Sequence, residues 1–462
     1  MTLDRSAAAE LERPVESVRD LVDFFRAGEK PRANWQLGME HENLGLYEAS
    51  AKPVPFDGEH GIEALLGRYA IDGGWKRVVE AGRVIALDRD GKSITLEPGG
   101  QLELSGRPWA SALDAAREFR EHLETLRRVS EPAGIAWLAL GMQPLHDTAR
   151  APRIPKERYR IMREYLPAHG SMALDMMHVT ASVQVSFDFS DEDDMRSKLR
   201  AALACGPIVS AIYANSSLVG GRSSGYVSKR MIVWRNTDPA RCGPIPFVFE
   251  PDFGYARYAE WALDVPMFFI LRGERYVPMR GITFRSYLRD GHAGERATLA
   301  DWNRHLTTVF PDVRMKRVIE VRGADSCPAE LTCSVPALWK GLLYAPAARE
   351  AVLALLGGWS AAEREQAYDA IARRGLAAEA AGRKVLDLAR ELLGLAHEGL
   401  AALAAAGAGA GSQTGGPADE RSLLEPVAAQ LARGQSPGQV LLEEWEGPIG
   451  HDPDRLIRYA RY

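Results

Sequence analysis

Cysteine is scarce in this chain: 462 residues contain only Cys205, Cys242, Cys327 and Cys333. No two of them form a C-x-x-C pair, and four in a chain of this length are too few for a disulfide scaffold. The sequence therefore predicts four reduced thiols and a reducing compartment, the cytoplasm.

Other features are also missing. No apolar run approaches the roughly 18 residues of a membrane-spanning helix, and the charged residues before Pro14 are unlike a secretory signal. The 57 Lys and Arg residues against 62 Asp and Glu give a net charge of −5. Nucleic-acid binding usually needs a basic surplus, so neither a membrane nor a nucleic acid is an expected partner.

Three common catalytic motifs are absent as well. Gly91-Lys92-Ser93 looks like the end of a P-loop, but Ala86 stands where its first glycine is required. There is no H-E-x-x-H and no G-x-S-x-G sequence. The Gly-Lys-Ser segment is therefore interpreted as an exposed turn.

The hydrophobic pattern predicts a mixed fold. Hydrophobic residues make up 46% of the chain and charged residues 26%, as in a soluble globular protein. Strands are expected before about residue 330 and helices after Leu338, which favours an α+β fold with a largely antiparallel sheet. The chain is expected to form one domain, 1–462, with a helical part at 340–462 and an Ala/Gly-rich flexible loop at 404–417. The expected helices include Val15–Ala27, Ala110–Val129 and Met195–Asn215, and the expected strands are Gln36–Tyr47, Glu97–Ser105 after a Gly-Gly turn, Ile135–Met142, Val183–Phe189 and Arg317–Arg322.

Glutamates recur two residues apart in these strands. In the segment containing Glu40 and Glu42, positions i and i+2 place both carboxylates on one face of the strand. Like charges there repel each other unless a cation lies between them, and Mg²⁺ prefers such oxygen ligands. A solvated polar strand face would show the same pattern.

Two further predicted strands also carry acidic residues on one face. After Glu97, the strand carries Gln101, Glu103 and Ser105 on one face, and Gly99-Gly100 allows close approach of the backbone. Near the end of the strand region, Glu320 and Arg322 share a face, with Lys316 just before them. They could form a structural ion pair or a metal ligand beside a phosphate clamp. Gln184 offers one more polar group.

Many acids and few bases on one sheet face indicate bound divalent cations, which usually bridge to substrate phosphates. Phosphoryl transfer from ATP is the reaction that this arrangement favours. Cationic residues of the middle third, among them Arg222, Arg230 and Arg241, could hold an anionic co-substrate, although loop arginines are often simply solvated.

A dozen ordered blocks along the chain resemble glutamate–cysteine ligases of the plant and proteobacterial type. The blocks include residues 38–42 (GMEHE), 93–106 (SITLEPGGQLELSG), 158–163 (RYRIMR), 174–177 (LDMM), 183–185 (VQV), 213–216 (YANS), 246–249 (PFVF), 262–267 (ALDVPM), 314–317 (RMKR), 320–325 (EVRGAD) and 341–344 (GLLY).

The resemblance implies a glutamine-synthetase-like fold, with a curved antiparallel sheet lining the active site and helices outside. It implies ATP, Mg²⁺, L-glutamate and L-cysteine as ligands, in a monomer or homodimer that makes γ-glutamylcysteine through γ-glutamyl phosphate. The resemblance implies metal binding for Glu40, Glu42, Glu97, Glu103, Gln184 and Glu320, phosphate binding for Arg322, and substrate binding for Arg222. Beside these roles we expect catalysis from Arg322 and Glu320, phosphate binding by Lys316, and substrate binding by Arg230, Trp234, Arg241 and Tyr258.

The chain departs from this family pattern where the amino-acid substrates should lie. Val179-Thr180 stands where the family usually has Arg-Thr, and residues 220–225 and 232–238 also differ. A ligase on the same scaffold that uses another amine therefore stays an alternative, as does a nucleotide-binding regulator without turnover. Met279 occupies the place of a cysteine in the plant redox disulfide, so that switch is expected to be absent.

Overall fold

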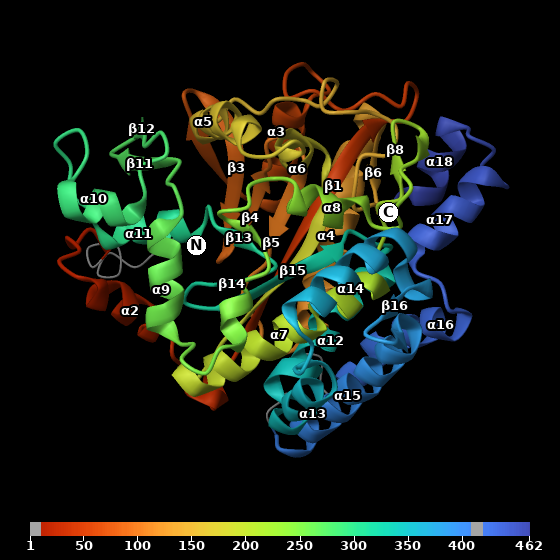
Figure 1. Cartoon of the computed structure of the whole chain (residues 1–462). Coiled ribbons are helices and arrows are strands. Elements are labelled where there is room, and N and C mark those ends of the chain that lie inside the picture. Colours follow the sequence, from red (N-terminus) through yellow and green to blue (C-terminus); the bar gives the residue numbers. More distant parts are fainter. Residues whose placement is uncertain (1–10, 408–418) are drawn as a thin grey trace.

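The computed structural model describes residues 11–407 and 419–462, and its centre is a nine-stranded antiparallel sheet (Figure 1). The strand order is β14-β15-β7-β1-β5-β4-β3-β2, and β6 pairs with the second half of β1. The bounds are β1 Leu37–Tyr47, β2 Lys76–Glu80, β3 Arg83–Arg89, β4 Lys92–Leu96, β5 Leu102–Ser105, β6 Ile135–Leu138, β7 Ser182–Phe187, β14 Val313–Met315 and β15 Ile319–Asp325.

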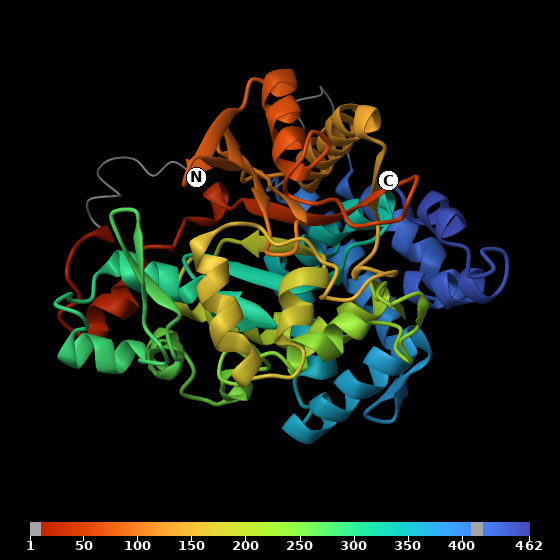
Figure 2. The same cartoon turned by 90° about the horizontal axis from the view of Figure 1, so that it is seen from above.

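Helices surround this sheet and form most of the C-terminal third, drawn in blue at one side of Figures 1 and 2. None of the described helices is both long and apolar enough to cross a membrane. The helices before β15 are α2 Val18–Arg26, α3 Ile62–Gly73, α4 Ala112–Ser130, α5 Glu157–Tyr165, α6 Ala173–Val179, α7 Glu192–Ile212, α8 Lys229–Arg235, α9 Tyr255–Asp264, α10 Phe284–Asp290 and α11 Leu299–Leu306. Those after it are α12 Ala329–Tyr344, α13 Pro346–Leu356, α14 Ala361–Arg374, α15 Val385–Ala405, α16 Glu425–Arg433, α17 Pro437–Glu446 and α18 Pro453–Ala460.

The predicted α+β class and antiparallel sheet are confirmed, and the predicted strands and helices are found with shifted ends. Two details differ. A short hairpin, β16 Glu379–Ala380 with β17 Arg383–Lys384, interrupts the helical part, because Ala381 and Gly382 adopt positive φ and turn the chain back. The segment around Arg222 is a second short hairpin, β8 Leu218–Val219 with β9 Arg222–Ser223, rather than an irregular loop. Of the predicted loop 404–417, residues from 408 onward lie outside the described chain.

Strand β1 separates the core from the functional face. Its residues alternate, so Leu37, Met39 and His41 are buried on one side while Glu40 and Glu42 are half-buried on the other. Helices α4 and α12 pack against the buried side, and α5, α6 and α8 contribute side chains to the opposite side. The alternation of the sequence thus decides which side chains are available for chemistry.

The buried side of β1 carries a polar anchor. His41 Nε2 lies 2.7 Å from the hydroxyl of Tyr462, and that hydroxyl donates to the carbonyl of Cys327 at 2.9 Å. A hydroxyl has one proton to donate, so the Tyr462 oxygen accepts from His41 Nε2–H. Burial, followed by the nearby His122, keeps the pKa of His41 well below its usual range, so the ring is neutral. The strand that carries Glu40 and Glu42 is therefore tied directly to residue 462.

The turn before β5 confirms the close approach expected at Gly99-Gly100. A Cβ on Gly99 would lie only 2.0 Å from the carbonyl oxygen of His178, and Gly100 has a φ of +81°. Only glycine avoids the clash at position 99 and adopts the positive φ at position 100 without strain. The close contact holds Glu97 and β5 against the end of helix α6.

Candidate functional site

The sheet register brings three of the predicted glutamates together. Glu42 on β1 is directly opposite Glu103 on β5, and Glu40 is opposite Ser105 on one side and Gln184 of β7 on the other. Residues that face each other across antiparallel strands share a face, with Cβ atoms roughly 5 Å apart. The two-residue spacing recognised in the sequence therefore becomes one acidic surface.

This surface lines a cavity of about 160 Å³, here named the carboxylate pocket. It lies between the sheet and helices α5, α6 and α8. Its lining residues with polar or charged side chains are Glu40, Glu42, Glu97, Gln101, Glu103, Arg158, Tyr159, Thr180, Gln184, Trp234, Thr307, Arg314 and Arg322. Five of the six predicted metal ligands are in this set, and the sixth, Glu320, lies behind it.

The surroundings of the pocket raise the pKa values of its carboxyl groups. Burial, and then the charge of Glu97, raises the pKa of Glu42 to about 7. Burial and then Glu40 raises the pKa of Glu103 well above its usual value, and burial with Glu320 raises that of Glu40. A cation placed among these acids would favour their ionised forms.

Two of the carboxylates are held in place by hydroxyl and amide donors. Glu42 Oε2 accepts hydrogen bonds from the backbone and hydroxyl of Ser182, at 2.6 and 3.0 Å. Glu103 accepts from Thr95 at 3.1 Å and from Ser105 at 3.0 Å. Glu40 has no hydrogen-bond partner among the described residues. These contacts fix the direction of two carboxylates and leave lone pairs free toward the cavity.

A divalent cation fits the chemistry of this pocket. Among the described residues, no three His, Cys, Asp or Glu side chains already converge closely enough to form a ready metal site. The donor set nevertheless consists of carboxylate oxygens with raised pKa values, which is the ligand type that Mg²⁺ prefers. The donor atoms of the pocket therefore suit a hard cation such as Mg²⁺.

Glu320 has different partners from the other glutamates. Both its oxygens are bound by Arg314 at 2.8 Å, Lys316 lies 2.9 Å away, and Arg322 also pairs with it. Burial alone would raise the pKa of Glu320, but these three cations hold it well below its usual range. The sequence left open whether Glu320 and Arg322 form a structural ion pair or a metal ligand beside a phosphate clamp, and the structure shows the ion pair. Lys316 lies beside Glu320 and does not line the pocket.

Arg322 forms the wall at the far end of the pocket. Its Nη1 bonds to both Glu320 and the side-chain oxygen of Gln184, and its guanidinium lies over Trp234 and Phe310, 5.5 and 5.8 Å from the ring centroids. Burial acts to lower the pKa of Arg322, but Glu320 and the pocket glutamates raise it overall. This places a permanent cation beside the acidic surface.

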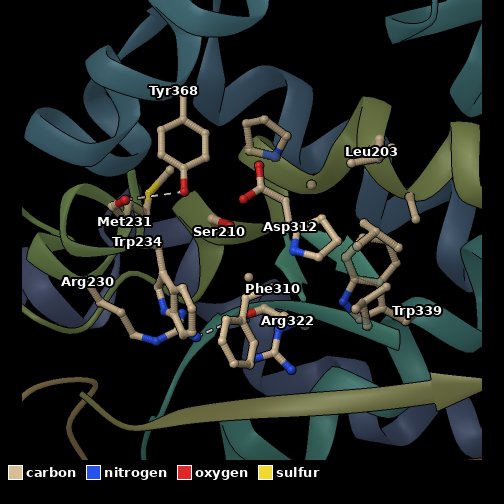
Figure 3. A pocket seen from close by; sticks show the side chains of 17 residues that line it. Leu203, Ser210, Arg230, Met231, Trp234, Phe310, Asp312, Arg322, Trp339 and Tyr368 are labelled. Carbon is tan, nitrogen blue, oxygen red and sulfur yellow. Dashed lines mark hydrogen bonds between the residues drawn. The ribbon is translucent and has the colours of Figure 1, made fainter. Parts of the chain in front are cut away.

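A second cavity of about 40 Å³, named the arginine crevice, lies on the other side of this wall (Figure 3). Arg322, Trp234 and Phe310 line both cavities. Arg230 contributes from α8, donating its Nη2 proton to the carbonyl of Arg322 at 3.0 Å, while its Nε is buried without a partner in the described chain. Asp312 faces the same crevice (Figure 3), and its carboxylate forms no hydrogen bond with any described residue.

The predicted substrate-binding residues divide into two groups. Arg230 lines the arginine crevice, and Trp234 lines both cavities. Arg222 is exposed on its hairpin and lines neither cavity. Arg241 is fully buried, paired with Asp238 at 2.7 Å and bonded to two backbone carbonyls, and the buried Tyr258 hydroxyl accepts from the backbone of Met315. The last two therefore support the fold around the site.

The sequence alone did not predict two arginines that line the pocket. Arg158 on α5 lines the cavity over Tyr159, and it has no ion-pair partner among the described residues. Its signal was helical spacing, because Arg158, Tyr159 and Met162 lie along one side of α5. Arg314 is directly opposite Glu320 across β14 and β15. The sequence did not indicate this pairing, because β14 has only three residues and shows no clear strand pattern.

Comparison with known proteins agrees with this architecture. Residues 36–455 match the profile of glutamate–cysteine ligase family 2 (GCS2). The chloroplastic glutamate–cysteine ligase of Medicago truncatula is 39% identical over 446 residues, covering 95% of this chain and 85% of that protein. The Arabidopsis thaliana enzyme is 37% identical over 96% of this chain and 82% of its own length. The crystal structure of glutamate–cysteine ligase from Francisella tularensis in complex with AMP has a similar fold, with a TM-score of 0.53 at 12% identity, over 93% and 89% of the two chains.

Proposed function

Because the chain belongs to glutamate–cysteine ligase family 2, we propose that the carboxylate pocket is where it uses ATP to join L-glutamate to L-cysteine. Its activity is that of an ATP-dependent glutamate–cysteine ligase, which makes γ-glutamylcysteine for glutathione biosynthesis. The single observation that carries the assignment of the site is the convergence of Glu40, Glu42, Glu97 and Glu103 on one cavity.

The acidic side of the pocket would hold Mg²⁺ through Glu42, Glu97 and Glu103, with Glu40 close by. Bound there, the cation would neutralise phosphate charge during phosphoryl transfer. Ser182 and Thr95 keep two of these carboxylates oriented before any ligand arrives. The order built into the sheet reduces the reorganisation needed at the moment of reaction.

The arginines supply the positive charge that phosphoryl transfer requires. Arg322 and Arg158 border the same cavity, and Arg158 has no ion-pair partner in the part of the chain that the structure describes, so a triphosphate between them would be flanked by guanidinium groups. The γ-carboxylate of glutamate attacks the terminal phosphorus and ADP leaves, giving γ-glutamyl phosphate. The amine of cysteine then attacks the acyl carbon, loses a proton, and expels inorganic phosphate. No covalent bond to the protein is required.

The wall of Trp234, Phe310 and Arg322 marks the side on which the amino acids would bind. Arg230 is 3% exposed and pairs with Asp325 at 3.6 Å, and its Nε–H has no acceptor within the described chain, so it can still donate a hydrogen bond to a substrate carboxylate. Four free cysteines support the cytoplasm as the compartment in which the enzyme works.

The test is an ADP-release assay with glutamate and a panel of amines, combined with mass analysis of the product. The proposal expects ADP only when glutamate and an amine are both present, with cysteine preferred. Glutamate-dependent ADP release with a different preferred amine would reassign the acceptor, and binding of ATP without any turnover would contradict the enzymatic role.

Two arginine variants test which basic residues touch the amino acids. Arg230→Ala should raise the KM for glutamate at least about tenfold, because it removes a buried cation from the cavity wall. Arg222→Ala is the matched comparison, since Arg222 is exposed and away from both cavities. Equal effects of the two substitutions would contradict the assignment of Arg230.

A further inference from the structure

One hydroxyl joins two strands of the carboxylate pocket that are not paired with each other. The hydroxyl of Tyr462 accepts from His41 on β1 and donates to the carbonyl of Cys327, two residues beyond the end of β15, over 2.7 and 2.9 Å. Strand β7 lies between β1 and β15 in the sheet. β1 bears two acids of the pocket, and β15 bears Arg322 at its wall. The hydroxyl therefore connects the acidic and the basic side of the pocket from the opposite face of the sheet.

The register of the sheet brings the bridged segments together. His41 is paired with Val183 of β7, and Val183 is paired in turn with Ala324 of β15. These three residues therefore lie in one row across the sheet. The chain that leaves β15 also contacts β1 directly, because the hydroxyl of Ser326 donates to the carbonyl of Glu42 at 2.9 Å. The bridging hydroxyl lies at this crossing.

The backbone determines where this hydroxyl lies. The N–H of Tyr462 donates to the carbonyl of Trp137 on β6 at 3.0 Å, and the N–H of Ala139 donates to the carbonyl of Ala460 at 2.7 Å. Residues 460–462 thus run antiparallel beside β6, which is itself paired with β1. Burial raises the pKa of the Tyr462 phenol well above its usual range, so the hydroxyl keeps the proton that it donates.

His41 depends on this one hydrogen bond. Its Nδ1 is buried without a partner among the described residues, and the ring of Phe119 packs against it with the centroids 4.7 Å apart. Without the Tyr462 oxygen, the Nε2–H of His41 would lose its acceptor, and an unpaired buried donor is unfavourable. His41 lies between Glu40 and Glu42 in the strand, so a shift of His41 would move both acids.

We propose that Tyr462 is a positioning residue for the ligation reaction. By bridging β1 and the segment after β15, its hydroxyl fixes the separation of Glu40 and Glu42 from Arg322 across the carboxylate pocket. Tyr462 does not line that pocket, so it acts through His41. The inference rests on the proposed use of ATP in this pocket. A displacement of about 1 Å at a reacting group can cost about a hundredfold in rate, so a distant bridge can matter to turnover.

The first test is Tyr462→Phe, which keeps the ring and removes the bridging hydroxyl. Initial rates should show kcat lowered at least about tenfold, and the Mg²⁺ concentration for half-maximal rate raised about tenfold, as when a group that supports metal ligands is lost. The KM for glutamate should change by less than about twofold, because substrate binding itself is not altered. Unchanged kcat and an unchanged Mg²⁺ requirement would overturn the proposal.

Tyr213→Phe is the matched control. Tyr213 is fully buried, and its hydroxyl forms a hydrogen bond of 2.8 Å with the hydroxyl of Ser334. It lines neither the carboxylate pocket nor the arginine crevice. Both variants lose a hydroxyl and some thermal stability, but only Tyr462→Phe should lose turnover and metal affinity. Equal losses of turnover in the two variants would reveal a general folding effect and overturn the proposal.

Chemical rescue separates the hydroxyl from the bulk of the ring. Tyr462, Trp137 and Leu126 line a cavity of about 320 Å³ between α4 and β6, and Tyr462→Gly would leave the space of a phenol beside it. Such engineered spaces bind small aromatic molecules. Added 4-methylphenol should restore kcat of Tyr462→Gly several-fold, whereas toluene, which lacks the hydroxyl, should not. Equal rescue by both compounds would show a packing role alone and overturn the proposal.

Metal binding gives a readout that needs no turnover. Titration with Mn²⁺, followed by electron paramagnetic resonance, should show about tenfold weaker binding to Tyr462→Phe than to the wild-type chain or Tyr213→Phe. An unchanged Mn²⁺ affinity would overturn the positioning role. A wild-type chain that releases no ADP with any amine would instead contradict the proposed function, and the Mn²⁺ comparison would still decide whether Tyr462 positions the acids.

Discussion

Glu42 on β1 and Glu103 on β5 are direct cross-strand partners, and both carboxylates line the same cavity. Like charges placed directly opposite on a sheet destabilise it. Burial and neighbouring carboxylates raise the pKa of each, so the two groups do not ionise readily together. A cation held between them, as proposed above, would favour the ionised form of both.

Replacing either partner should separate function from stability. We expect Glu42→Gln or Glu103→Gln to lower ligation about a hundredfold or more, roughly 2.7 kcal/mol of transition-state stabilisation. Thermal unfolding without Mg²⁺ should be unchanged or shifted upward, because a buried like-charge contact is removed. Glu274→Gln, at an exposed position, is the control. Near-wild-type turnover of both variants at saturating Mg²⁺ would contradict the metal role.

Arg322 should not tolerate lysine. Its guanidinium pairs with Glu320 and Gln184 while lying over two aromatic rings, and an ammonium cannot reproduce this planar arrangement. We expect Arg322→Lys to lower kcat by at least about tenfold, or roughly 1.4 kcal/mol. Initial rates at saturating substrates test this, and an unchanged kcat would leave Arg322 with a structural role only.

Glu320 should behave as a structural group. Its removal leaves the buried Arg314 without its counter-ion, and breaking a buried ion pair costs about 3–5 kcal/mol. We expect Glu320→Gln to lower the free energy of unfolding by about 3 kcal/mol. In a double-mutant cycle, adding Arg314→Gln should cost much less than it does alone. Unchanged stability with a raised Mg²⁺ requirement would restore the metal-ligand interpretation.

Strands β1 and β7 and the acidic residues of β1 were predictable because they follow local rules. Alternation on β1 and β7 and the two-residue spacing of Glu40 and Glu42 determine the face on which each side chain lies. The separation of Glu320 from the other acids could not be predicted in this way. It depends on Arg314, which reaches Glu320 only because β14 and β15 pair in one particular register.

Long-range packing decides the surroundings of two other residues predicted to bind substrate. Arg222 and Arg241 both follow glycine-rich or polar segments, yet one is exposed and the other is fully buried. The difference arises because Asp238, Thr308 and Pro266 surround the Arg241 guanidinium. Thr308 and Pro266 are distant in the sequence, so local composition carries no signal of their contact.

A buried histidine should make the fold sensitive to acid. Burial lowers the pKa of His305 to about 4, whereas an unfolded histidine titrates near 6.5. As pH falls from 6.5 to 4, the unfolded chain binds a proton that the folded chain does not, so the free energy of unfolding decreases. The contribution is at most about 1.4 kcal/mol per pH unit. His305→Gln should reduce this slope in denaturant titrations, and the exposed His451→Gln should not.

Activity should be indifferent to mild reductants and oxidants. All four cysteines are free thiols within the described residues, and Cys205, Cys327 and Cys333 are buried. Burial raises the pKa of Cys333 to about 12, which disfavours the reactive thiolate. Cys327 and Cys333 also point to different acceptors, the carbonyls of Tyr213 and Ala116. An activity loss with dithiothreitol that reoxidation reverses and Cys327→Ser removes would reveal a disulfide switch.

The contact between His41 and Tyr462 can form only late in protein synthesis. The two residues are 421 positions apart, so the strand bearing Glu40 and Glu42 is made early and receives this hydrogen bond late. At about 5–20 residues per second, translation separates the two events by roughly 20–80 s. During that interval the imidazole of His41 lacks its acceptor. The nascent chain then already contains Glu40 and Glu42, but the hydrogen bond that ties their strand to Tyr462 has not formed. The final contacts of the strand that carries Glu40 and Glu42 therefore form only after residue 462 has been added.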